Sequence, residues 1–211
     1  MVTSPAARDA LLATKDVLQV MAGPNAVRGQ WSAEDRNSDR VRVALIQFYV
    51  EEDQAPTFHE LALQVKLSEP SVRTLIEGLR RRDLAVLENE RIVGAYPFTA
   101  RDTGHQVTLD GRTVNATCAI DALGVGAMTG RDVAIVSNCR YCGSSIRVTT
   151  RKLGQNLALV KPDTTVVWQS VQYRGLCAAN SLCTATAFLC SHLARWHAND
   201  PGRRLRGRRC D

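Results

Sequence analysis

The hydrophobic pattern of the first half of the chain predicts several short helices. Residues 5–21, 40–52 and 68–79 carry apolar side chains three or four positions apart, which places them on one face of a helix. Thr57 and Glu60 form a capping-box pattern, in which two side chains satisfy exposed backbone N–H groups. A further helix is therefore expected from this point to about residue 65.

Two short apolar stretches follow these helices. Residues 84–87 and 91–95 surround a polar turn and are expected to form a strand pair. Residues 25–39 are polar and rich in turn formers, and are interpreted as a linker. Helix, helix, helix and hairpin is the order of a winged-helix domain, which the sequence predicts for residues 40–100.

The second half of the chain changes to a strand pattern. Asp110-Gly111 is a strong hairpin-turn signal, and a helix carrying Cys118 and Asp121 is expected after it, broken near Gly124 and Gly126. A short closing helix is expected over residues 192–198. Strands are predicted at residues 107–109, 113–116, 133–136, 146–149, 157–160, 165–168 and 182–189. The fold class expected is α+β, with a winged-helix-like helical part before a mixed β-sheet domain.

Composition narrows the protein class. The chain has 211 residues and no uninterrupted apolar run of membrane-spanning length, and its first ten residues lack the pattern of a secretory signal. We therefore expect a cytoplasmic protein without a membrane partner. Six of the seven cysteines lie between Cys118 and Cys190, and in a cytoplasmic chain this indicates thiol chemistry or metal binding.

The formal charge of +6 is concentrated at one end of the chain. Residues 201–211 hold five arginines and one aspartate, which leaves only about +2 for the rest. The fourth helix carries Arg73, Arg80, Arg81 and Arg82, which could contact DNA. A basic tail is more often a solvated end than a specific reader, so we expect no sequence-specific nucleic-acid binding.

Cys118 and Asp121 are the strongest candidates for chemistry. Three residues apart, they fall on one side of a helical turn. A thiol is a ligand for a soft metal, and a carboxyl group can deliver a proton. A second thiol beside them would complete a site that holds a metal and protonates a bound group.

Cys139 and Cys142 form a second pattern. Cys-x-x-Cys-Gly is half of a zinc-ribbon signature. The later cysteines, Cys177, Cys183 and Cys190, are spaced six and seven residues apart and form no matching pair. A metal at Cys139 and Cys142 is therefore an open possibility on the sequence.

The chain resembles the organomercurial lyase (alkylmercury lyase, MerB-type) family. The resemblance is strongest at Cys118-Ala119-Ile120-Asp121 within its hairpin context, and it covers about the central two thirds of the chain. It also includes residues 91–96, 103–113, 117–123, 136–139, 181–183 and 188–191, and Trp196. One departure is Thr184-Ala185, where the best-known members carry a cysteine and a histidine.

The resemblance implies an enzyme and its site. Cys118, Asp121 and Cys183 would be catalytic, with Cys118 and Cys183 holding mercury and Cys177 and Cys190 as rivals for the second thiol. The substrate would be an organomercurial, the products a hydrocarbon and bound Hg(II), with no cofactor required. Low-molecular-weight thiols would release the metal, and a mercuric reductase would be a partner. The expected domains are residues 1–39, 40–100 (winged helix), 101–199 (catalytic) and 200–211 (basic tail).

Two alternatives stay open on the sequence alone. The first is a soft-metal or zinc-binding protein without lyase activity, using Cys118, Cys139, Cys142 and Cys183. The second is a metal-responsive winged-helix transcription regulator. Asp121 favours the enzyme, because binding alone needs no proton donor. The Cys-x-x-Cys pattern favours the binding protein, and the basic tail favours the regulator.

Overall fold

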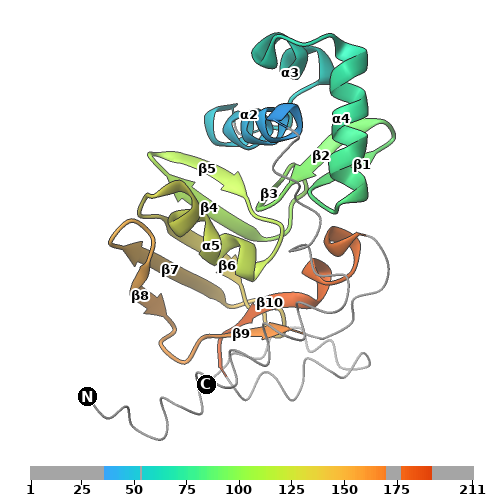
Figure 1. The fold of residues 1–211 in the computed structure, drawn as a ribbon. Helices are drawn as coiled ribbons and strands as arrows, with labels where there is room; N and C mark the ends of the chain where they lie inside the picture. Colours follow the sequence, from blue (N-terminus) through green and yellow to red (C-terminus); the bar gives the residue numbers. More distant parts are fainter. Residues whose placement is uncertain (1–35, 53, 170–176, 192–211) are drawn as a thin grey trace, which may run out of the picture. The chain divides into compact units, whose positions relative to one another are not determined.

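The computed structural model describes residues 36–52, 54–169 and 177–191. The predicted helices over residues 5–21 and 192–198, and the basic tail over 200–211, lie outside these residues. The first described elements are α2 (Arg36–Glu52), α3 (Phe58–Val65), α4 (Glu69–Arg81), β1 (Ala85–Glu88), β2 (Arg91–Ala95) and β3 (Phe98–Thr99) (Figure 1).

Local capping explains where α3 and α4 begin. The Thr57 N–H donates to Glu60 Oε2 over 2.7 Å, and the Glu60 N–H donates to Thr57 Oγ1 over 3.2 Å. This is the predicted capping box. The Ser68 hydroxyl caps α4 in the same way by accepting from the Ser71 N–H. Short-range sequence signals thus determine both helix starts.

The predicted linker was wrong at its C-terminal end. Residues 36–39 are helical and open α2, although they are polar. Asp39 lies in the first turn, where a carboxylate meets the positive end of the helix dipole. Val41 and Leu45 are fully buried one and two turns further on, so packing of the apolar face extends the helix into the polar segment.

The order of three helices followed by strands is confirmed. β1 and β2 pair antiparallel, and β2 pairs antiparallel with β3 to complete a three-stranded sheet. Tyr49 of α2 and Phe98 of β3 are both buried, with ring centroids 6.1 Å apart. The more specific winged-helix assignment stays a prediction.

A five-stranded antiparallel sheet forms the centre of the second half, in the order β5-β4-β6-β7-β8. β9 pairs with β10 in a separate ribbon, and a bridge from Phe98 to Ala116 links the two halves. The elements are β4 (His105–Leu109), β5 (Arg112–Asn115), α5 (Ala119–Thr129), β6 (Ala134–Asn138), β7 (Ser145–Arg151), β8 (Asn156–Lys161), β9 (Val166–Gln169), η2 (Ala178–Asn180), η3 (Cys183–Ala185) and β10 (Thr186–Leu189).

The sheet buries one face beneath α5 and β10. Side chains of β4, β6 and β7 alternate between buried and exposed, as expected of strands with one covered face. α5 packs against β4 and β10, and β10 also contacts β6 (Figure 1). Asp110 and Gly111 both have positive φ in the β4–β5 turn, as the predicted two-residue hairpin requires.

Helix α5 runs without the predicted break. Gly124 and Gly126 both lie within it. At Gly126 an added Cβ would lie 2.8 Å from Gly154 Cα and 2.9 Å from the Arg131 carbonyl oxygen. This glycine therefore allows the β7–β8 turn to approach the helix closely, and does not interrupt it.

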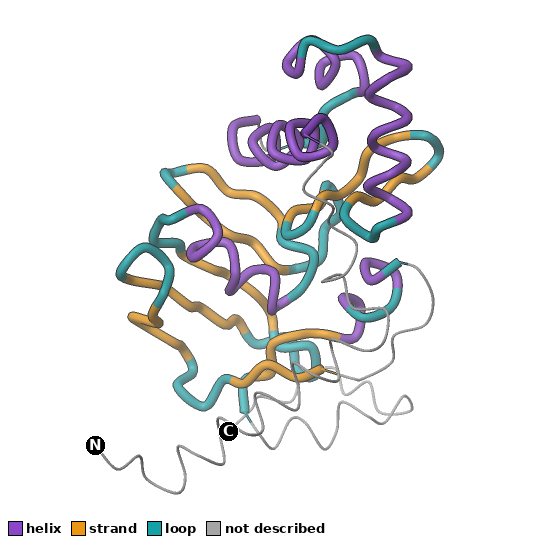
Figure 2. Tube along the Cα trace, in the orientation of Figure 1, coloured by secondary structure: helices purple, strands orange, loops and turns teal. Residues whose placement is uncertain are grey.

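The predicted strand over residues 182–189 was also wrong in its first half. Residues 183–185 form the short 3₁₀ helix η3, and only Thr186–Leu189 is a strand. Figure 2 shows the two short helical turns that precede β10. The Thr186 hydroxyl donates to the Leu182 carbonyl oxygen over 2.8 Å, which favours a local turn over an extended chain. The α+β class itself, helices followed by antiparallel sheets, is confirmed.

Among residues 36–52, 54–169 and 177–191, no helix is both long and apolar enough to cross a bilayer.

Candidate active site

Cys118 occupies the N-cap position of α5. Its backbone is extended, and its sulfur accepts a hydrogen bond from the Asp121 N–H over 3.4 Å. The N-terminus of a helix carries a partial positive charge and unpaired N–H groups. The Cys118 sulfur therefore lies at the positive end of the α5 dipole.

Cys183 reaches the same place from a distant part of the chain. It lies in η3 and is only 8% exposed. Its Sγ donates to Asp121 Oδ2 over 3.7 Å. The Cys118 sulfur, the Cys183 sulfur and one Asp121 oxygen all lie within 4.8 Å of one another. The three predicted catalytic residues are thus brought together.

The surroundings raise the pKa of two of these groups. Burial raises the pKa of the Asp121 carboxyl above its usual value, and hydrogen bonds from Cys118 and Cys183 only partly oppose this. The pKa of the Cys183 thiol is raised as well, first by its hydrogen bond with Cys118 and then by burial. A proton shared between Cys183 and Asp121 along their hydrogen bond therefore lies inside the buried site, beside the Cys118 sulfur.

The segment before Cys183 is anchored to the helical half. The Asp83 carboxylate follows α4 and accepts the Ala178 N–H at 2.9 and 3.1 Å. The Tyr96 hydroxyl donates to Asp83 over 3.4 Å. These contacts fix η2, which lies just before η3 in the chain. Sequence reasoning missed Asp83, because no local signal connects it with a residue 95 positions away.

The rivals for the second thiol lie elsewhere. Cys190 groups with Cys139 and Cys142, whose three sulfurs lie within 4.8 Å of one another. Cys177 precedes η2 and belongs to neither group of metal-binding donors found among the described residues. The sequence singled out Cys139 and Cys142 but missed that Cys190 completes their group.

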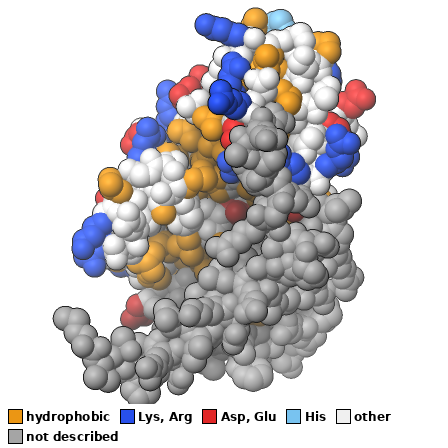
Figure 3. Space-filling view, in the orientation of Figure 1, with side chains coloured by type: hydrophobic (Ala, Val, Ile, Leu, Met, Phe, Trp, Pro, Cys, Tyr) orange, Lys and Arg blue, Asp and Glu red, His pale blue; other side chains and the backbone are white. Residues whose placement is uncertain are grey.

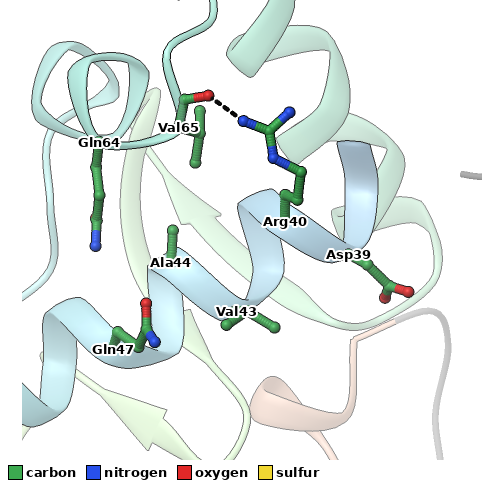
Figure 4. A pocket seen from close by; sticks show the side chains of 7 residues that line it. All are labelled: Asp39, Arg40, Val43, Ala44, Gln47, Gln64 and Val65. Carbon is green, nitrogen blue, oxygen red and sulfur yellow. Dashed lines mark hydrogen bonds between the residues drawn. The ribbon is translucent and has the colours of Figure 1, made fainter. Parts of the chain in front are cut away.

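A hollow of about 360 Å³ lies between α2 and α3, and its lining includes no residue of either cysteine cluster. Figure 4 shows its lining, with the Arg40 guanidinium donating to the Val65 carbonyl oxygen over 2.6 Å. No cysteine lines it. Figure 3 shows hydrophobic side chains gathered on the face of the molecule that it draws.

Comparison with known protein families gives a match to the second half of the chain. The family model described as alkylmercury lyase matches residues 98–206, a range that contains Cys118, Asp121 and Cys183. The chain belongs to the alkylmercury lyase family. The resemblance noted in the sequence is thereby confirmed.

Relatives of the alkylmercury lyase family match the same part of the chain. The alkylmercury lyase of Staphylococcus epidermidis is 32% identical over 123 residues, which are 58% of this chain and 54% of that protein. The alkylmercury lyase of Bacillus cereus is 30% identical over 114 residues, 54% of this chain and 50% of that protein. The chain thus spans about half the length of the curated relatives it matches.

A solved structure extends the likeness to more of the fold. The crystal structure of the mercury-bound form of MerB2 superposes with a TM-score of 0.66 at 29% identity, covering 84% of each chain. The α+β architecture of this chain is therefore the architecture of a MerB protein.

Proposed function

We propose that this protein cleaves the carbon–mercury bond of organomercurials by protonolysis, giving a hydrocarbon and Hg(II). The observation that carries the proposal is the convergence of Cys118, Asp121 and Cys183 within 4.8 Å. Two sulfurs suit a soft metal, and the carboxyl group supplies a proton to the leaving carbon. A purely binding site would have no use for a carboxyl whose pKa is raised by burial.

The first step is capture of the substrate. The Cys118 sulfur displaces the ligand X of R–Hg–X as its thiol proton leaves, forming Cys118–S–Hg–R and HX. Placement at the N-terminus of α5 favours the charge that develops on this sulfur.

The second step breaks the carbon–mercury bond. Cys183 passes its proton along its hydrogen bond to Asp121, and its sulfur binds mercury. The electron pair of the Hg–C bond goes to carbon, which takes the proton from Asp121. The products are R–H and Hg(II) held by Cys118 and Cys183, with Asp121 returned to its carboxylate form.

Release completes the cycle. Two equivalents of an external low-molecular-weight thiol bind the Hg(II), and each gives a proton to one of the two protein sulfurs. These steps use only the protein's own side chains and the external thiol, so no organic cofactor is required. A mercuric reductase would be a partner because it consumes the released Hg(II).

The decisive experiment measures hydrocarbon release. Pure protein is incubated with an organomercurial and excess thiol, and the hydrocarbon is quantified by gas chromatography. More than one hydrocarbon per chain is expected, with none above background for Cys118→Ser. Cys177→Ser is the matched control, because Cys177 belongs neither to the cluster of Cys118, Asp121 and Cys183 nor to that of Cys139, Cys142 and Cys190. Undiminished release by a folded Cys118→Ser variant would exclude the mechanism.

The Cys139, Cys142 and Cys190 group favours one other function, soft-metal binding without turnover. The same incubation separates the two functions. A binding protein would retain R–Hg on the chain, detected as an intact organomercury adduct by mass spectrometry, and would release no hydrocarbon.

A further inference from the structure

A second group of sulfurs lies at the other end of β10 from Cys183. Cys139 and Cys142 sit in the turn between β6 and β7, and Cys190 directly follows β10. Their three sulfurs lie within 4.8 Å of one another, and those of Cys142 and Cys190 are 3.6 Å apart. The proposed cleavage mechanism uses none of them.

Backbone hydrogen bonds shape this turn around Cys139. The Gly143 N–H donates to the Cys139 carbonyl oxygen, and the Cys139 N–H to that of Ser144, both over 2.8 Å. Gly143 has φ of +75°, a conformation that glycine adopts without strain. The tight turn directs both cysteines of Cys-x-x-Cys-Gly to one side, as in half of a zinc-ribbon site.

The end of β10 is fastened to the same turn. The Arg140 N–H donates to the Phe188 carbonyl oxygen over 3.1 Å. The Cys190 N–H donates to the Cys139 sulfur over 3.4 Å. The Thr164 hydroxyl holds the Cys190 carbonyl oxygen over 2.6 Å. The group is therefore held together by the backbone, independently of any ligand.

The donor set points to a particular class of ion. All three donors are sulfur, and thiolates select soft or borderline ions such as zinc and cadmium. Zinc–sulfur bonds of about 2.3 Å in tetrahedral geometry place sulfurs about 3.8 Å apart. The distances of 3.6 Å to at most 4.8 Å span this value. Cys139 and Cys190 are buried and Cys142 is partly exposed, so an ion would approach past Cys142.

One feature makes such a site conditional on redox state. Cys190 is disulfide-bonded, whereas Cys139 and Cys142 are thiols. A disulfide sulfur carries no thiolate charge and cannot act as the third strong ligand. Two electrons and two protons from an external dithiol would break the bond and leave a thiol on Cys190 and on its partner sulfur.

We propose that Cys139, Cys142 and Cys190 form a second, non-catalytic site for a thiophilic divalent ion of the zinc and cadmium class, open only when Cys190 is reduced. Binding would replace three thiol protons by three metal–sulfur bonds, with a water or external ligand in the fourth position. Because Cys190 directly follows β10, the strand that begins after η3, the ion would also stabilise this strand.

The test uses the full chain carrying Cys118→Ser and Cys183→Ser, so that the candidate active site cannot bind the probe. Cd(II) is titrated into phosphine-reduced protein and followed by thiolate-to-cadmium charge-transfer absorption in the ultraviolet and by metal analysis after gel filtration. One Cd(II) per chain is expected. Adding Cys142→Ser should weaken binding at least tenfold, while adding Cys177→Ser as the control should leave it unchanged.

The second measurement is Cd(II) binding to the oxidised protein. Without reductant, Cd(II) binding should fall at least tenfold. The proposal is overturned if reduced protein with a native circular dichroism spectrum binds no Cd(II), or if Cys142→Ser binds as tightly as its parent. Equal binding before and after reduction would overturn the redox requirement. Because the active-site thiols are absent, none of these outcomes depends on whether the protein is a lyase.

Discussion

Cys183 and Asp121 are hydrogen-bonded through Sγ and Oδ2 over 3.7 Å, although 62 residues separate them in the chain. Asp121 belongs to the first turn of α5, and Cys183 to the short helix η3. The contact connects the proposed second thiol directly with the proposed proton donor. Substituting each residue on its own tests the role proposed for it.

Replacing Asp121 by asparagine should stop proton delivery but leave both sulfurs in place. We expect hydrocarbon release to fall at least 100-fold, within the range of about 10²–10⁴ that general acid catalysis contributes. Mercury should still bind, as shown by mass spectrometry of the adduct. Asp163→Asn, at an exposed carboxyl, is the matched control. Turnover at the parent rate in Asp121→Asn would mean that the proton comes from another group.

Cys183→Ser and Cys177→Ser should behave differently. Of these two described cysteines, Cys183 is the one grouped with Cys118 and Asp121. Its loss should therefore leave R–Hg on one sulfur and reduce hydrocarbon release at least 100-fold. Cys177→Ser should turn over at nearly the parent rate. Single-turnover release and mercury stoichiometry measure both effects. An inactive Cys177→Ser beside an active Cys183→Ser would reverse the assignment.

Asp83 should act as a positioning residue for the segment that carries Cys183. Asp83→Ala removes the acceptor of the Ala178 N–H, and loss of a hydrogen bond to a charged group costs about 1.5–3 kcal/mol. Asp83 also has φ of +57°, which asparagine tolerates better than alanine. Asp83→Asn is therefore the conservative control.

The readout for Asp83 is the rate at which iodoacetamide alkylates Cys183, mapped by peptide mass spectrometry. Cys183 is 8% exposed, so detachment of the segment should speed its alkylation in Asp83→Ala and much less in Asp83→Asn. The rate at Cys142 is the internal reference. Equal Cys183 rates in all three proteins would show that Asp83 does not position this segment.

His105 should make folding stability depend on pH. Burial, with a smaller contribution from Arg140, lowers its pKa to about 4 from 6.5. As pH falls below 6.5, the unfolded chain binds a proton that the folded chain does not, so stability is lost progressively down to about pH 4. The shift corresponds to a loss of about 3 kcal/mol.

Urea unfolding between pH 7 and pH 4.5 measures this effect. His105→Gln should flatten the slope of unfolding free energy against pH, whatever its effect on stability at pH 7. His59→Gln is the control, because the His59 side chain is 72% exposed. A slope that His105→Gln leaves unchanged would assign the pH dependence to other groups.

The helical half should not read a DNA sequence. Arg73 pairs with Glu69 at 2.8 Å and Arg80 with Glu77 at 2.6 Å, so two cations of α4 are already partly neutralised. DNA affinity depends on the number of phosphates that cations neutralise. Any binding should be weak, sequence-independent and lost on deletion of residues 203–211. Salt-resistant footprinting of a defined site by the tail-less protein would instead favour a transcription regulator.

Signals that act over a few residues were sufficient for the local structure. The capping box of Thr57 and Glu60, the Asp110-Gly111 turn and the pairing of Cys118 with Asp121 across one helical turn all involve neighbours in the chain. Their geometry follows from backbone conformation and short hydrogen bonds, which the residue types specify directly. The family resemblance added Cys183, but spacing alone did not separate it from Cys177 and Cys190.

Tertiary structure decided which sulfurs meet. The turn at η3 places Cys183 against Asp121, and the four residues of β10 then carry Cys190 to the turn that holds Cys139 and Cys142. The same structure brought Asp83 to Ala178 and let α5 continue through Gly126. Each of these contacts joins residues that are far apart in the sequence. Each therefore depends on the path of the chain in the folded protein and on the packing of the elements involved. No pattern of neighbouring residues contains that information, because the partners are joined only by folding.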